Sequence, residues 1–120
     1  YIVVDYKATA KKDEITALDQ PWHESFKRQM DIYQWLLKKN GHKVSNTGYI
    51  LYCNGNAYEE QFASKIEFRM TLLPYEGDSS WVDDITVRLH ACLNSGELPE
   101  PEPYCDYCKY LAAVGEHQIP

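Results

Sequence analysis

Apolar residues near the start of the chain follow two spacings, which predict two kinds of element. The continuous, β-branched run Ile2-Val3-Val4 predicts a strand over residues 1–8 that is buried on both faces. Farther on, apolar residues recur at i, i+4, i+7 and i+11, the spacing of one face of a helix. This stripe predicts a helix over residues 22–40 that stops at Gly41. Its core positions would be Phe26, Met30, Tyr33 and Leu37.

The rest of the chain alternates strand-like, helix-like and breaker-rich segments. Residues 44–53 and 66–72 are rich in strand formers, and Asn54-Gly55-Asn56 between them is a turn signal. A second amphipathic helix is expected over residues 80–95, followed by an extended Pro/Glu-rich segment over 97–104 and a short terminal helix or turn. The resulting order β-α-β-β-α predicts an α/β (α+β) fold, a mixed central sheet flanked by helices.

Length and composition indicate one globular domain. The chain has 120 residues, of which 44% are hydrophobic, enough for a single modest core. We expect one domain, with a core over residues 1–96 and a tail over 97–120. No run approaches the roughly 18 apolar residues of a membrane span, and no basic-then-apolar leader is seen, so a cytoplasmic protein is expected. Because the chain begins inside a predicted strand, we also expect a further segment before Tyr1 in the complete protein.

The charge is unevenly distributed. The net charge of −6 argues against a broad nucleic-acid footprint. Residues 1–45, however, carry eight Lys and Arg against six Asp and Glu, whereas the remainder carries four against twelve. The candidates for nucleic-acid contact in the basic half are Lys11, Lys12, Lys27 and Arg28. The alternative is that they form ordinary solvated helix and loop surfaces.

The first candidate site is the pair Asp5-x-Lys7 at the end of the first predicted strand. Residues two apart in a strand project to the same face, so the carboxylate and the ammonium point the same way. A carboxylate there can hold a divalent metal, and the ammonium can polarise a phosphate or a water. A solvent-facing ion pair is the common alternative, but charges on a buried strand are costly unless they serve a function.

The second candidate lies on the first predicted helix. Gln29 and Tyr33 are four residues apart and therefore share a helix face. A glutamine that points toward the sheet needs a polar partner, and the Asp5 and Lys7 cluster is a suitable one. The alternative is an ordinary amphipathic helix with Gln29 at its border.

The four cysteines and four histidines give weaker signals. Cys105-x-x-Cys108 is half of a tetrahedral metal site, without a second pair at suitable spacing. Cys53 and Cys92 are expected to be small core residues. The histidines lack metal-ligand spacing, and we expect His23, near the start of the first helix, to be a surface or capping residue.

In this order, the segments resemble the PD-(D/E)xK nuclease superfamily. Within it they resemble the RecB-like exonucleases, which include CRISPR-associated RecB-type nucleases and the nuclease domains of helicase–nuclease complexes. Val3-Val4-Asp5-Tyr6-Lys7 is similar to the acid-x-Lys strand of that family, Gln29-x-x-x-Tyr33 to its Gln-x-x-x-Tyr helix, and Gly48-Tyr49-Ile50-Leu51-Tyr52 to its next strand. Gly96-Glu97-Leu98-Pro99 and Cys105-x-x-Cys108-x-Tyr110 resemble the approach to its C-terminal cysteines.

The resemblance implies a role for each matching residue. Asp5 and the backbone carbonyl of Tyr6 would be ligands of Mg²⁺ or Mn²⁺. Lys7 would polarise the water or stabilise the pentavalent phosphate. Gln29 would orient Lys7 or the water, and Tyr33 would pack beneath the site or touch a phosphate.

Two departures from the family pattern limit what the resemblance implies. The family places another acidic ligand on the preceding strand, which would lie before Tyr1. Its iron–sulfur branch uses four cysteines, whereas Ala112-Ala113-Val114 follows Cys108 here. We therefore expect no intact iron–sulfur cluster, with Cys105 and Cys108 as a vestigial or incomplete metal site.

Three functions follow as hypotheses. The first is a metal-dependent DNA nuclease, exonuclease-type, as a fragment of a larger nuclease that works with a helicase or another complex subunit. The second is a catalytically inactive nuclease-fold module that binds DNA or docks to a protein. The third makes the cysteine tail a small zinc or partner-binding element. DNA versus RNA and exonuclease versus endonuclease action stay open.

Overall fold

The computed structural model describes residues 1–58, 64–97 and 99–116, and the chain divides into two compact units, Tyr1–Asp83 and Asp84–Pro120. The first unit contains β1 (Val4–Thr9), α1 (His23–Lys39), β2 (Thr47–Gly55) and β3 (Phe68–Glu76). Helix α2 (Val82–Ser95) starts at the end of this unit, and α3 (Asp106–Glu116) lies in the second. None of the helices in the described ranges has the length and apolar character that a membrane crossing needs.

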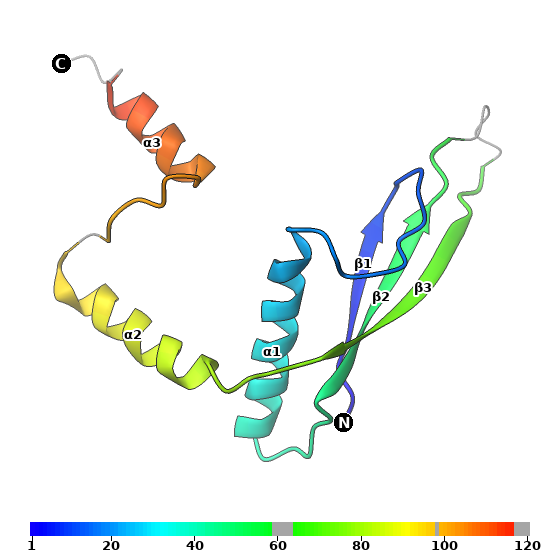
Figure 1. The fold of residues 1–120 in the computed structure, drawn as a ribbon, viewed down its shortest axis with the longest axis horizontal. Helices are drawn as coiled ribbons and strands as arrows, with labels where there is room; N and C mark the ends of the chain where they lie inside the picture. The colour runs from blue at the N-terminus through cyan, green and yellow to red at the C-terminus, as the bar shows by residue number, and fades with distance from the viewer. Residues whose placement is uncertain (59–63, 98, 117–120) are drawn as a thin grey trace. The chain divides into compact units, whose positions relative to one another are not determined.

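The three strands form one mixed sheet in the order β1-β2-β3. Strands β1 and β2 are parallel and are joined through α1, whereas β2 and β3 are antiparallel. Helix α1 runs along one face of this sheet (Figure 1). The predicted α+β fold with a mixed sheet is confirmed.

Strand β1 is buried on one face only, so the expectation of a strand buried on both faces was wrong. Ile2, Val4 and Tyr6 are 61%, 55% and 58% exposed. The intervening Asp5 and Lys7 are largely covered. The physical reason is that α1 runs along one face of the sheet (Figure 1), whereas the side chains of β1 on the opposite face stay exposed. A continuous apolar run does not distinguish one-sided from two-sided burial.

Helix α1 begins and ends close to where the apolar spacing placed it. Gly41 follows it with φ +84°, the left-handed conformation that a glycine adopts without strain. The expected core stripe was only partly right, because Met30 is fully buried but Tyr33 is 38% exposed. The helix also buries three polar residues against the rest of the unit, His23, Asp31 and Gln34.

The core lies between α1 and the sheet, where Met30 packs with Ile50, Tyr52 and Leu73. The helix approaches β2 closely at Gly48. A Cβ at this position would lie 2.6 Å from Sδ of Met30 and 3.2 Å from the backbone oxygen of Val3. A glycine therefore lets the helix settle onto the sheet.

The expected tight turn at Asn54-Gly55-Asn56 is wrong. Asn54 and Gly55 belong to β2, which pairs with β3 as far as Gly55 and Phe68. The buried side chain of Asn54 instead holds the loop after β1: its Oδ1 accepts the Lys11 N–H at 2.8 Å, and its Nδ2 donates to the oxygens of Lys11 and Asp13 at 2.9 and 3.2 Å. Residues 59–63 of the connection lie outside the described residues.

The C-terminal elements match the sequence predictions in kind. Helices α2 and α3 are present, and the described residues of the Pro/Glu-rich segment between them are not helical, with Leu98 outside the described ranges. Cys53 is buried as expected, but Cys92 is exposed on α2, so its assignment to a core was wrong.

Candidate active site

Asp5 and Lys7 project from β1 toward α1 because the register of the sheet places them there. Asp5 is paired with Ile50, which is fully buried, and Lys7 is paired with Tyr52, which is 4% exposed. In a parallel pair, paired residues share a face. The side chains of Asp5 and Lys7 retain 14% and 20% exposure, so both are largely covered yet reachable from solvent.

The Lys7 ammonium lies at the centre of the site. Its Nζ is 2.8 Å from Oδ2 of Asp5 and donates a 2.6 Å hydrogen bond to Oε1 of Gln29. It also lies 4.4 Å from the centroid of the Phe26 ring, a cation–π contact. A carboxylate, an amide oxygen and an aromatic face thus hold this long side chain in one position.

Gln29 connects Lys7 to Tyr33. Its Oε1 accepts from Lys7, and its Nε2 lies 2.6 Å from the Tyr33 hydroxyl oxygen, to which it donates. The chain Asp5–Lys7–Gln29–Tyr33 therefore runs from the sheet to the outer side of α1. The structure brings together the four side chains that the sequence proposed as a site, while their chemical roles stay predictions.

The Asp5 carboxylate is paired with Lys7 but keeps 14% exposure. Its Oδ2 is buried and forms an ion pair with Lys7, but it receives no well-directed hydrogen bond from the described residues. A carboxylate oxygen is a ligand that Mg²⁺ and Mn²⁺ prefer, and Mg²⁺ is often held by one or two carboxylates together with waters and substrate phosphates. The described residues contain no group of three or more His, Cys, Asp or Glu placed to hold a metal. Asp5 and the Tyr6 carbonyl thus fit such an ion in type, as a partial set of ligands.

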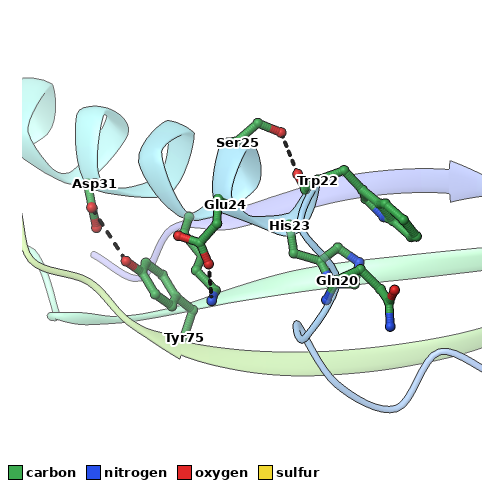
Figure 2. Close-up of polar contacts among 8 residues, drawn as sticks. Gln20, Trp22, His23, Glu24, Ser25, Asp31 and Tyr75 are labelled. Carbon is green, nitrogen blue, oxygen red and sulfur yellow. Dashed lines mark hydrogen bonds and ion pairs between the residues drawn. The ribbon is translucent and has the colours of Figure 1, made fainter. Parts of the chain in front are cut away.

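The four basic residues proposed for nucleic-acid contact occupy different surroundings. Lys11 Nζ lies 4.2 Å above the Trp22 ring, and Lys27 forms a 2.6 Å ion pair with Glu24, which lowers the pKa of that carboxyl (Figure 2 shows the Glu24 contact). Lys12 and Arg28 are exposed. Lys11 is thus the member whose contact places it beside an exposed aromatic ring.

His23 is buried, so the expectation of a surface residue was wrong, whereas its capping role is present. Only 2% of it is exposed, and its Nδ1 accepts the Gln20 N–H at 3.0 Å at the start of α1. Burial lowers the pKa of His23, which favours the neutral ring. The adjacent Trp22 is 49% exposed. The sequence did not indicate a functional role for it, because a single aromatic residue outside the apolar stripe has no periodic pattern.

Cys105 and Cys108 lie at the start of α3 in the second unit. Backbone hydrogen bonding from Cys108 lowers the pKa of Cys105, while the hydrogen bond to Cys105 raises the pKa of Cys108. Their assignment as a vestigial metal site stays a prediction.

The mixed sheet thus presents an acid and a lysine to a glutamine on the crossover helix. The sequence matches the PD-(D/E)XK nuclease superfamily over residues 1–113, and the chain therefore belongs to this superfamily. Its members are nucleases that act on DNA and generally use divalent metal ions. No curated protein and no solved structure gave a significant match.

Proposed function

We propose that this chain carries catalytic residues of a metal-dependent, exonuclease-type DNA nuclease of the RecB-like branch, as part of a larger nuclease. The observation that supports this most directly is the position of the Lys7 ammonium. It is 2.8 Å from Oδ2 of the Asp5 carboxylate and 2.6 Å from Oε1 of Gln29, which holds it in place. A cation held in place before the substrate arrives needs little reorganisation when charge develops on a phosphate.

Each residue of the site has a distinct part in this proposal. The Asp5 carboxylate and the Tyr6 carbonyl would hold Mg²⁺ or Mn²⁺, which when bound would supply an acidified water and neutralise phosphate charge. Lys7 donates to a non-bridging oxygen of the scissile phosphate. Gln29 positions Lys7, and Tyr33 fixes the orientation of the Gln29 amide through the 2.6 Å contact to its Nε2.

A second candidate is a catalytically inactive module that binds DNA or docks to a protein. Two observations favour it: the net charge of −6, and a described site with a single carboxylate beside Lys7. Such a module would bind DNA in a salt-dependent manner without cutting it.

The test measures cleavage of end-labelled linear and closed circular DNA, single- and double-stranded, with Mg²⁺, with Mn²⁺ and with EDTA. We expect linear DNA to be cut, circular DNA to resist and EDTA to stop the reaction. Lys7→Ala should slow cleavage by about 100- to 1000-fold, the usual effect of removing one stabiliser of transition-state charge. Lys65→Ala is the matched control, because Lys65 is 71% exposed and pairs only with the exposed Glu67 in a described contact.

The outcomes separate the candidates. Cleavage by Lys7→Ala at the rate of Lys65→Ala would refute the role of Lys7. Cleavage of closed circles would replace exonuclease with endonuclease action. Salt-dependent binding of DNA by the unaltered full-length protein, without cleavage under either metal, would establish the inactive module instead.

A further inference from the structure

A cavity of about 530 Å³ opens beside Lys7 and has no part in the proposed chemistry. It lies between the end of β1, the loop of residues 10–22 and the first turn of α1. Its walls include Lys7, Lys11, Trp22, His23, Phe26 and Tyr52. Its volume lies within the range of small-molecule sites, and it is larger than a single nucleobase.

The loop that forms the outer wall is held in place. Asn54 of β2 makes three hydrogen bonds to the backbone of Lys11 and Asp13. Ile15 and Leu18 of the same loop pack against the buried core. The cavity is therefore bounded by segments with fixed partners.

The inner wall is aromatic. The His23 ring meets the rings of Trp22, Phe26 and Tyr52 at centroid distances of 5.6, 5.8 and 5.9 Å. Trp22, which also lines the cavity, is 49% exposed, and its indole projects beyond the start of α1 (Figure 2). Planar rings around an open space suit a planar aromatic ligand, which gains by stacking.

The polar groups of the cavity suit a neutral heterocycle better than a phosphate. Because Nδ1 of His23 accepts the Gln20 N–H, the neutral ring carries its hydrogen on Nε2, and none of the described residues hydrogen-bonds to that nitrogen. Because His23 lines the cavity, this Nε2–H is its candidate donor. The carboxylates of Asp13, Glu14 and Asp19 also line it, and they accept from amino groups but repel phosphate.

We propose that this cavity binds one unpaired nucleobase of the DNA strand whose phosphate lies at Lys7. This inference rests on the proposed DNA-binding function of the Lys7 site. The base would stack on Trp22 and displace the Lys11 ammonium, which lies 4.2 Å from that ring and would then be free to meet a phosphate. A paired base is enclosed by its stack and its partner, so only a strand with an unpaired base can use the cavity.

The test measures binding with the metal chelated, so that it does not depend on cleavage. The affinity of an unmodified single strand is compared with that of strands in which one nucleotide is abasic. The abasic nucleotide is placed in turn at each of the first six positions from either end, and the fluorophore is attached to the opposite end. We expect one position at which loss of the base weakens binding about tenfold, within the range for stacking of one base. In Trp22→Ala this difference should vanish, and in Trp22→Phe it should persist, since phenylalanine still stacks.

Three results would overturn the inference. The first is a scan in which no position changes affinity by more than twofold. The second is a Trp22→Ala variant that keeps the full abasic effect. The third is dAMP competing as tightly as the strand, which would assign the cavity to free nucleotides. A blunt duplex should show no abasic effect. If the protein cleaves DNA but no abasic position weakens binding, base binding in the cavity is refuted and the nuclease function stands. If one abasic position weakens binding but the protein does not cleave DNA, base binding stands and the nuclease function is refuted.

Discussion

The substitution Asp31→Asn tests whether a buried carboxylate on α1 holds the segment that follows β3. Asp31 is 5% exposed. Its Oδ1 accepts the Asp78 N–H at 3.0 Å, and its Oδ2 accepts the Trp81 Nε1–H at 3.0 Å and a longer contact from the Tyr75 hydroxyl at 3.4 Å. Figure 2 shows the contact with Tyr75.

An asparagine fits the same space but carries one acceptor oxygen and one donor group. Whichever way the amide turns, either Asp78 or Trp81 faces an N–H₂ instead of an oxygen. One hydrogen bond to a charged group is lost, which costs roughly 1.5–3 kcal/mol. Relief of the cost of burying the charge offsets part of this loss, so we expect a decrease of about 2 kcal/mol in the free energy of unfolding.

Urea unfolding followed by circular dichroism measures this change. Asp83→Asn is the matched control, because Asp83 pairs with Lys39 at 2.8 Å but the two side chains are 62% and 54% exposed. An exposed pair contributes about 0–1 kcal/mol. If Asp31→Asn destabilises the protein no more than Asp83→Asn does, the reasoning about the buried carboxylate is wrong.

Two further predictions use the titration of buried or paired groups. Burial and the nearby Asp31 charge raise the pKa of Tyr75 to about 12, above its ordinary value of about 10. The stability that the neutral phenol contributes is therefore complete below pH 10 and is lost as the pH rises toward 12. In urea unfolding measured across that interval, Tyr75→Phe should lose less stability than the unaltered protein. Equal losses would contradict the assignment. The lowered pKa of Cys105 predicts that iodoacetamide alkylates it faster than the exposed Cys92, while Cys53, 4% exposed, reacts only on unfolding. Peptide mass spectrometry gives the three rates, and a Cys53 that reacts as fast as Cys92 would show that β2 is open.

The sequence predicts those features that depend on local spacing. Helix α1 follows from its apolar period, and the meeting of Lys7 with Gln29 follows from the two-residue period of β1 and a helix that crosses back over the sheet. The prediction of a turn at Asn54 was wrong because the pairing of β2 with β3 continues to Gly55. The side-chain amide of Asn54 instead hydrogen-bonds to a loop more than forty positions earlier in the chain. No local pattern encodes such a partner, and the same holds for the cavity beside Trp22.

The buried polar residues of α1 explain why Gln29 faces Lys7. His23 accepts from the loop before the helix, Asp31 accepts from the segment after β3, and the Gln34 amide donates to the oxygens of Ser45 and Asn46 at 3.2 and 2.7 Å. Each partner lies in a different connection, so a rotation of the helix would leave several buried polar groups without hydrogen bonds, which is costly.

The rotation of α1 is thus fixed along its whole length by polar contacts as well as by Met30, which is fully buried next to Gln29. A helix turns about 100° per residue, so a small rotation would carry the Gln29 amide away from Lys7. The 2.6 Å contact between the two therefore depends on anchors remote from the site. Substitutions at those anchors should weaken any activity that requires a fixed Lys7 ammonium, even though they touch neither Asp5 nor Lys7.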